Sequence, residues 1–367
     1  MKNILILFGG CSSEYSVSLC SASAVLHGLN PSEYQAVPVG ITQTGDWYYY
    51  PGPVEKIQDD TWHFSPDCIP ALLSPNRSRH CLLLMKSEGV EELHVDAAFP
   101  ILHGKNGEDG TLQGIIELSG IPLIGCGTLS SAICMDKDRA HKLASLAGIR
   151  VPKAMVLDSC HDSSDLSLAQ NFADDVGYPL YVKPVKAGSS YGVTRVSRRS
   201  ELQSAMNLAF QYDNQIILEE NIEGFEVGCA VLGKHQLIIG EVDEIELSGG
   251  FFDFTEKYTL KTSAIYVPAR ISAEKRAEIK SCAKRIYKAL GCSGFARVDM
   301  FLTPEGEIVF NEVNTIPGFT EHSRYPGMMK AAGYSFCEVL TKILEVGLED
   351  TDTLRHEPTN KEKKDIL

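Results

Sequence analysis

Short hydrophobic runs alternate with amphipathic segments along most of the chain. A run at residues 2–8 is followed by a glycine turn and a helical pattern over residues 17–29, and a second run covers residues 36–41. This order predicts a strand, a helix and a strand, which is typical of a doubly wound α/β unit. Residues 51–94 contain several prolines and polar clusters, and we expect them to be irregular.

A strand at residues 95–102, a glycine-rich loop at 103–110 and a helix at 111–119 complete an N-terminal α/β domain, which we place at residues 1–128. A central unit over residues 129–221 and a C-terminal unit over 222–348 are predicted to follow. Their predicted elements are helices near 130–134, 137–147, 200–211, 279–290 and 335–348, and strands near 154–157, 180–183, 193–196, 294–302 and 307–313.

Two further segments differ in composition from these elements. Residues 248–261 form a glycine-rich insertion inside the C-terminal unit. Residues 349–367 are polar and charged without periodicity, so we expect a disordered tail.

The overall composition excludes several classes of function. Of the 367 residues, 44% are hydrophobic, and the formal net charge of -14 argues against nucleic acid or an anionic membrane as the main partner. No apolar run approaches the ~20 residues that span a bilayer, and the N-terminus lacks a secretory signal. The 11 cysteines include no C-x-x-C pair, which argues against a zinc site and favours a reducing cytoplasm.

Two neighbouring predicted strands carry polar side chains at a spacing of two. Arg297 and Asp299 lie on one strand, and Glu312 and Asn314 lie on the next. Residues two apart on a strand face the same side, so these oxygens are expected to share one surface. Carboxylate and amide oxygens are ligands that Mg²⁺ prefers. The alternative is a solvent-facing strand pair with an ordinary salt bridge.

A strand ending in Lys183 runs into a loop of small residues at 186–192, and Lys137 begins a predicted helix. Such a loop lets backbone N–H groups approach phosphate oxygens, while a lysine supplies the charge. The segment is not a Walker A motif, and the alternative is a flexible hairpin turn.

Glu219, Glu220 and Glu226 follow the end of another predicted strand, a common place for contacts to adenine and ribose. The alternative is a solvated acidic loop. The loop at residues 103–110 precedes a predicted helix N-terminus, which attracts anions. There the alternative is a helix cap supplied by Asp109 or Thr111.

Taken together, these motifs resemble those of the D-alanine–D-alanine ligases over residues 1–348. The resemblance is carried, in this order, by residues 8–14, 102–114, 135–137, 182–184, 188–190, 256–258, 296–299 and 311–320. It implies an α/β chain with the ATP-grasp fold, α+β in its ATP-binding part. It also implies an ATP-dependent ligase that joins two D-amino acids through an acyl-phosphate, commonly as a homodimer.

The resemblance further implies a role for each matching residue. The phosphates and nucleoside of ATP would be held by Lys137, Lys183, Ser190, Glu219, Glu220, Ile222, Glu226 and Asn311. Two Mg²⁺ ions, for which Mn²⁺ can substitute, would be held by Asp299, Glu312 and Asn314. The catalytic group would comprise Glu14, Ser189, Lys257, Tyr258, Arg297 and Gly318, with residues 248–261 as a lid. Substrate contacts would come from His103, Asp243, Phe252, Ser323 and Arg324.

Two features concern the second substrate. Arg324 stands where ordinary D-alanine–D-alanine ligases usually have an apolar residue, and Lys257-Tyr258 is usually absent from the ligases that use D-lactate. Residues 322–326 resemble the ligases linked to vancomycin resistance, and residues 251–258 closely resemble the D-alanine–D-serine ligases among them, especially the VanG-type members. A serine hydroxyl needs a polar partner, and Arg324, oriented by Asp243, would supply it. The alternative is that Arg324 makes a salt bridge between domains, away from the pocket.

Three alternative functions compete with this prediction. A housekeeping D-alanine–D-alanine ligase would share nearly all of these motifs. A non-catalytic nucleotide-binding regulator of the same fold would be expected to lose Arg297 or the metal carboxylates, which this chain keeps. A nicotinamide oxidoreductase is disfavoured because the first turn lacks the G-x-G-x-x-G fingerprint.

Overall fold

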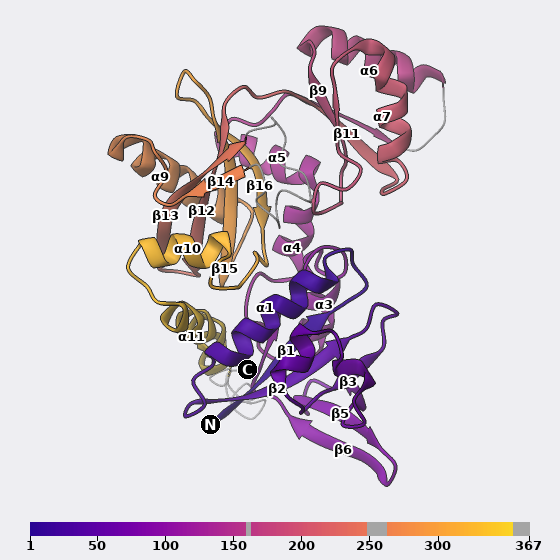
Figure 1. Cartoon of the computed structure of the whole chain (residues 1–367), viewed down its shortest axis with the longest axis vertical. Coiled ribbons are helices and arrows are strands. Elements are labelled where there is room, and N and C mark those ends of the chain that lie inside the picture. The colour runs from indigo at the N-terminus through magenta and orange to yellow at the C-terminus, as the bar shows by residue number, and fades with distance from the viewer. Residues whose placement is uncertain (159–162, 248–262, 355–367) are drawn as a thin grey trace, which may run out of the picture.

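The computed structural model describes residues 1–158, 163–247 and 263–354. Its first sheet is built around β1 (Lys2–Gly9), which pairs in parallel with β2 (Tyr34–Ile41) and with β7 (Ala97–Pro100). Parallel strands are covered on both faces, so the run from Ile4 to Phe8 is fully buried. The helices α1 (Tyr15–Gly28) and α3 (Thr111–Ser119) belong to this unit (Figure 1).

The expectation that residues 51–94 are irregular is wrong. They hold α2 (Val54–Gln58), the 3₁₀ turn η1 (Trp62–Phe64), β4 (Ile69–Leu73), β5 (Cys81–Lys86) and β6 (Gly89–His94). With β3 (Trp47–Tyr49), these strands extend the sheet antiparallel in the order β6-β5-β4-β3-β2-β1-β7. The prolines fall mostly between the short elements, and buried Trp62 fixes the segment by packing edge-on against Phe8.

A second sheet has four antiparallel strands in the order β10-β9-β11-β8. They are β8 (Ala154–Asp158), β9 (Leu180–Pro184), β10 (Thr194–Val196) and β11 (Gln215–Glu220). The helices α6 (Ser163–Val176) and α7 (Leu202–Ala209), the latter preceded by η2 (Arg199–Glu201), pack on this sheet and bury its alternate apolar residues.

The third sheet is antiparallel, in the order β14-β13-β12-β15-β16. Its strands are β12 (Phe225–Gly233), β13 (Leu237–Leu247), β14 (Ser263–Tyr266), β15 (Phe295–Leu302) and β16 (Ile308–Asn314).

Alternation along β12 assigns its two faces to different helices. Val227, Cys229 and Val231 share a core with α9 (Ala273–Ala289), whereas Ala230 and Leu232 share one with α10 (Arg324–Ala331). Gly228 therefore lies on the α10 face.

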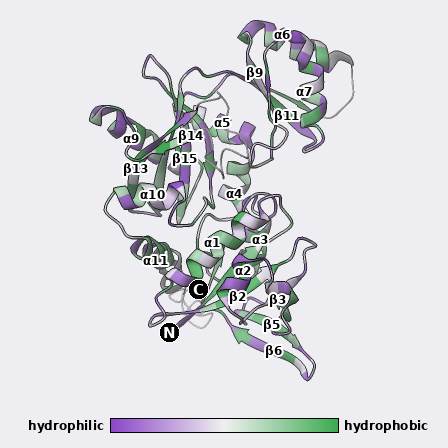
Figure 2. Ribbon diagram, viewed as in Figure 1, coloured by the Kyte–Doolittle hydropathy of each residue, from purple (hydrophilic) through white to green (hydrophobic). Residues whose placement is uncertain are grey.

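The N-terminal and C-terminal sheets share one hydrophobic core. Phe99 of β7 packs edge-on against Phe295 of β15 and against Phe319. The helices α4 (Thr128–Met135) and α5 (Lys137–Leu146) both pack on β16. In Figure 2 hydrophobic colour lies on strands of the three sheets and also on helices such as α7.

The last helix, α11 (Phe336–Leu354), packs against α1. The expectation of disorder from residue 349 is therefore wrong up to Leu354, and residues 355–367 lie outside the described part. Within that part, no helix is long and apolar enough to cross a membrane.

Candidate active site

A cavity of about 540 Å³ is lined by residues of the second and third sheets together with Lys137 of α5. It gathers every residue predicted to bind ATP although they are spread over more than 170 positions of the sequence. The lining includes Lys137, Lys183, Ser190, Glu219, Glu220, Ile222, Glu226 and Asn311, and also Ser189 and Glu312.

The deepest charges in this cavity form one cluster. Lys183 Nζ lies 2.6 Å from Glu219 Oε2, and the Glu219 side chain is buried while that of Lys183 is 13% exposed. Burial alone would lower the pKa of Lys183, but the Glu219 carboxylate outweighs it and raises that pKa. Glu219 Oε1 lies 3.7 Å from His141 Nδ1, and these two buried atoms have no hydrogen-bond partner among the described residues. Glu219 thus presents an acceptor that a bound molecule can use.

Arg297, Asp299, Glu312 and Asn314 meet across β15 and β16. Arg297 pairs with Asn314 and Asp299 with Glu312 in the strand register, so the four residues are direct neighbours. Asp299 Oδ2 accepts hydrogen bonds from Arg297 Nη2 at 2.7 Å and from Asn314 Nδ2 at 2.8 Å. The amide nitrogen of Asn314 faces Asp299. The amide oxygen of Asn314 therefore points away from Asp299.

This donor set fits a hard divalent cation. Glu312 lines the large cavity, and Asp299 and Asn314 add further oxygens beside it. Across the described residues, no group of three or more His, Cys, Asp or Glu side chains is arranged to hold a metal. A cation here would therefore need phosphate or water oxygens to complete its coordination.

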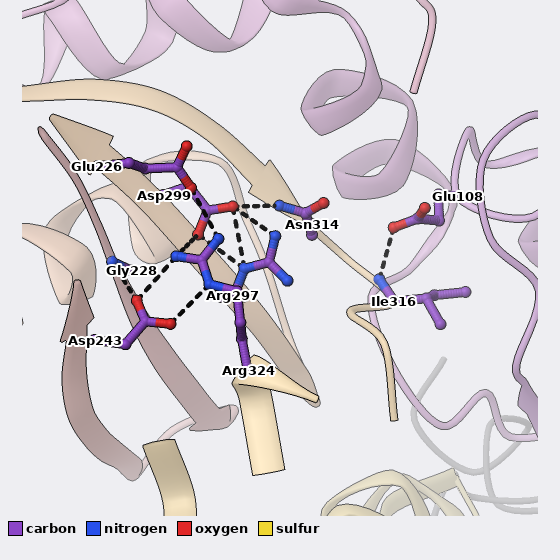
Figure 3. Close-up of polar contacts among 9 residues, drawn as sticks. All are labelled: Glu108, Glu226, Gly228, Asp243, Arg297, Asp299, Asn314, Ile316 and Arg324. Carbon is purple, nitrogen blue, oxygen red and sulfur yellow. Dashed lines mark hydrogen bonds and ion pairs between the residues drawn. The ribbon is translucent and has the colours of Figure 1, made fainter. Parts of the chain in front are cut away.

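Arg324 lies among three carboxylates of the third sheet (Figure 3). Its Nε and Nη2 donate to the two oxygens of Asp243 at 2.7 and 2.9 Å, and its Nη1 donates to Glu226 at 2.8 Å. Asp299 Oδ1 lies 3.5 Å from Nη2. Burial would lower the pKa of Arg324, but Asp243 and Asp299 hold that pKa well above its ordinary value. These ion pairs lie within the C-terminal unit, so they are not a bridge between domains.

Three of the five N–H groups of Arg324 donate to Asp243 and Glu226. The other two, one on Nη1 and one on Nη2, make no hydrogen bond within the described part of the chain. The guanidinium is therefore fixed by carboxylates and retains donors for a further partner.

Glu14 is held at the junction of the N-terminal and central units. The Ser189 hydroxyl donates to Glu14 Oε1. A Cβ atom on Gly104 would lie 2.4 Å from Glu14 Oε2, and one on Gly188 would lie 3.0 Å from it. The absence of side chains at these two glycines leaves the space that the Glu14 carboxylate occupies. Gly104 also has a φ of +70°, which favours glycine.

Glu108 and His103 hydrogen-bond to the backbone N–H and the backbone carbonyl of one residue, Ile316, in the segment that follows β16. Ile316 N donates to Glu108 Oε1 at 3.0 Å, and His103 Nδ1 lies 2.8 Å from the Ile316 carbonyl. Since that carbonyl only accepts, Nδ1 carries the proton and Nε2 accepts from the Ser21 hydroxyl at 3.1 Å. Ser21 Oγ in turn accepts from Phe319 N at 3.2 Å. The N-terminal domain thus holds both ends of residues 316–319, which include Gly318.

Glu108 also lines a small cavity together with Glu14. Its other oxygen accepts from Gly104 N at 2.8 Å. Burial and the nearby Glu14 carboxylate raise the pKa of Glu108 to about 8. Burial likewise lowers the pKa of His103, which agrees with a neutral imidazole.

This raised pKa predicts a loss of stability with rising pH. Between about pH 4.5, where the unfolded glutamate ionises, and about pH 8, the folded state keeps a proton that the unfolded state has lost. Stability should therefore fall across this window. The Glu108→Gln variant should show a smaller fall in melting temperature from pH 5 to pH 8 in the ligand-free protein. Glu88→Gln makes the same change at an exposed turn and should follow the parent, and parallel curves for all three proteins would refute the prediction.

Ser323 directly precedes α10, and its hydroxyl accepts a hydrogen bond from Thr320 N at 3.0 Å. A Cβ atom on Gly318 would lie 3.2 Å from Ser323 Oγ, so these two residues adjoin. The site thus has a serine hydroxyl at a helix N-terminus, a position that favours a carboxylate.

Residues 3–126 match the family described as D-ala D-ala ligase N-terminus, and residues 143–345 match the one described as D-ala D-ala ligase C-terminus. The chain belongs to the D-alanine–D-alanine ligase family. This confirms the predicted resemblance. The family is one of ATP-dependent ligases with the ATP-grasp fold, so both the predicted enzyme class and the predicted fold hold for this chain.

Three members of this ligase family illustrate the range of relatives. The crystal structure of VanG D-Ala:D-Ser ligase from Enterococcus faecalis is 57% identical, with a TM-score of 0.87 over 94% of this chain and 99% of that one. The vancomycin/teicoplanin A-type resistance protein VanA from Enterococcus faecium is 45% identical over 94% of this chain and 98% of its own. A D-alanine–D-alanine ligase from Caldicellulosiruptor bescii is 39% identical over 99% of this chain and 97% of its own.

Sequence reasoning about this ligase missed three residues that the tertiary structure brings to the site. Glu108 was part of a quoted motif without a role of its own. His141 lies four residues after Lys137, hence on the same helix face, and that spacing could have revealed it. Ser21 gave no signal, because a buried serine within a helix looks like any small core residue. The predicted residues Phe252, Lys257 and Tyr258, and the proposed lid at 248–261, lie outside the described part.

Proposed function

We propose that the enzyme ligates D-alanine to D-serine through a D-alanyl phosphate and so makes altered peptidoglycan precursors with lowered affinity for vancomycin. The observation that carries the choice of D-serine is the Arg324 guanidinium, whose side chain is 8% exposed, which is fixed by Asp243 and which keeps an N–H on Nη1 without a hydrogen bond among the described residues. The coarser activity, ligation of D-alanine to a second residue, belongs to the family.

ATP would lie in the large cavity. Lys137 and Lys183 would neutralise its phosphates, and the acidic strand end at Glu219, Glu220 and Glu226 would meet the nucleoside. The unpartnered Glu219 Oε1 supports this placement, because a buried acceptor is costly unless it finds a donor.

Asp299, Glu312 and Asn314 would hold Mg²⁺, or Mn²⁺ in its place, as two ions shared with the phosphates. When bound, the metal would supply positive charge against the phosphate oxygens. The carboxylate of the first D-alanine attacks the γ-phosphorus, releasing ADP, while Glu14 and its Ser189 partner hold the ammonium group of that D-alanine.

The amine of the second amino acid then attacks the acyl carbon, the peptide bond forms, the amine loses a proton and inorganic phosphate leaves. Arg297 and the Gly318 N–H stabilise the oxyanion that develops on the carbonyl. Ser323, at the N-terminus of α10, binds the carboxylate of this second substrate.

D-serine differs from D-alanine by one hydroxyl group. A hydrogen bond from a charged donor is worth ~1.5–3 kcal/mol, which corresponds to about a tenfold to hundredfold preference. D-alanine would then remain a poor second substrate. The similarity to a D-Ala:D-Ser ligase at 57% identity supports the same assignment.

A housekeeping D-alanine–D-alanine ligase is the competing function, and the 39% identity to a ligase of that name favours it. The two functions differ in the dipeptide formed. With ATP and Mg²⁺, we expect phosphate release to be faster with D-alanine plus D-serine than with D-alanine alone, and mass spectrometry should find D-alanyl-D-serine as the main product. Equal or faster formation of D-alanyl-D-alanine from an equimolar mixture would exclude the preference for D-serine.

We also propose a cytoplasmic homodimer. Ile115 and Leu118 on α3 and Leu129 on the adjoining α4 are large apolar side chains with 42%, 64% and 73% of their surface exposed. A second copy of the chain would cover them. Leu118→Glu should therefore halve the mass measured by light scattering. Leu168→Glu, on the distant α6, should leave the mass of the dimer unchanged, and a parent protein of monomer mass would exclude the dimer.

A further inference from the structure

Three acidic residues and one glycine form a row across the third sheet. Gly228 of β12 pairs with Asp243 of β13 on one side and with Asp299 of β15 on the other, and Asp299 pairs with Glu312 of β16. Directly opposed residues on neighbouring strands point to the same face. Gly228 therefore leaves a gap between two carboxylates.

The guanidinium of Arg324 fills this gap (Figure 3). A Cβ atom at position 228 would lie 2.5 Å from Arg324 Nη2, 2.7 Å from Asp243 Oδ1 and 2.8 Å from Met328 Cε. The N–H of Gly228 also donates to Asp243 Oδ1 at 2.8 Å, which orients the carboxylate that holds Arg324. Glycine thus supplies both the space and one of the bonds.

The backbone itself does not require glycine here. Gly228 is absent from the residues with positive φ, so alanine can adopt its conformation. The three atoms that a Cβ would meet are all at the ends of side chains, and none belongs to the main chain. A side chain at 228 would therefore displace the guanidinium rather than unfold the sheet.

We propose that Gly228 is a specificity-determining residue, because the missing side chain admits the Arg324 guanidinium between Asp243 and Asp299. This inference rests on the proposed role of Arg324 in choosing D-serine. A residue with a Cβ at this position would select against a hydroxylated second substrate without contacting that substrate.

The test is the Gly228→Ala variant. To regain an ordinary contact, Nη2 must retreat by about 1 Å, which breaks its hydrogen bond to Asp243 Oδ1. We expect the ratio of kcat/KM for D-serine to that for D-alanine, each as second substrate, to fall at least tenfold. The KM for ATP should change less than this ratio, because among the described residues that line the large cavity Arg324 donates only to Glu226.

Gly327→Ala is the matched control. It makes the same substitution on α10, three residues from Arg324, where a Cβ would meet nothing within 4 Å. The ratio should not move in this variant. A Gly228→Ala enzyme with the ratio of the parent would overturn the inference.

Arg324→Leu separates this inference from the function on which it rests. If the ratio changes in Arg324→Leu but not in Gly228→Ala, Gly228 has no role in specificity whereas Arg324 does. If the ratio is unchanged in both variants, neither Gly228 nor Arg324 determines the choice of the second substrate. With both substitutions present, Gly228→Ala should add no further change in ratio, because its target is gone, and additive effects would contradict the mechanism.

The double variant also covers a failure of Gly228→Ala to fold. If the added Cβ conflicts with the guanidinium, Gly228→Ala/Arg324→Leu should melt within a few degrees of Arg324→Leu. A much lower melting temperature for the double variant would mean that the Cβ conflicts with Asp243 or Met328 rather than with the guanidinium, and it would overturn the inference.

Discussion

Replacing Arg297 with methionine is expected to lower kcat for dipeptide formation by about 10²–10³-fold, which is the loss found when one preorganised oxyanion donor is removed from comparable sites. Arg297 is nearly buried, and its Nε and Nη2 both donate to Asp299. The carboxylate fixes the guanidinium, so its remaining donors need no reorganisation as negative charge develops. Steady-state phosphate release with both amino acids measures the effect.

Arg297→Lys is the informative control for this prediction. A lysine keeps the charge beside Asp299 but loses the planar fork, so it should restore folding stability more than rate. ATP affinity, measured by calorimetry, should change little in both variants, because Arg297 is not among the residues lining the cavity proposed for ATP. A methionine variant with more than a tenth of the parental kcat would remove Arg297 from the reaction.

Arg324→Leu is expected to abolish the preference for D-serine and also to destabilise the fold by about 3–5 kcal/mol, because it leaves Asp243 as an uncompensated buried charge. Asp243 is fully buried, and Arg324 supplies two of its hydrogen bonds. Competition between equimolar D-serine and D-alanine measures the preference, and chemical denaturation measures the stability.

The double variant Asp243→Leu/Arg324→Leu separates these two effects. It removes the buried charge with its partner, so most of the lost stability should return, whereas the preference for D-serine should not. Glu226 loses its ion pair with Arg324 but remains partly exposed to solvent. Asp299 also loses Arg324 but keeps its ion pair with Arg297. Recovery of the preference together with stability would mean that Arg324 acts on folding alone.

The sequence was sufficient for the family, the fold class and most of the local elements. The spacing of two in Arg297–Asp299 and Glu312–Asn314 predicted that each pair shares a strand face, and the register of β15 and β16 places the two pairs side by side. Strands and helices of that kind are set by local periodicity and need no knowledge of distant segments.

Local pattern failed where stability comes from distant contacts. The segment 51–94 looked irregular because its strands are short and interrupted by prolines, yet pairing with β2 and the burial of Trp62 order it. The helix α10 was not predicted, since Tyr325, Met328 and Met329 reveal their apolar face only against the third sheet.

The sequence by itself therefore determined the ligase family to which this chain belongs, because residue types and their spacing carry the motifs of that family. Only the tertiary structure decided how the residues of those motifs are held. Residues more than 200 positions apart, such as Glu108 and Ile316, meet through hydrogen bonds that no local pattern encodes. Likewise, the space at Gly228 that admits Arg324 exists only because three strands and a helix converge on it.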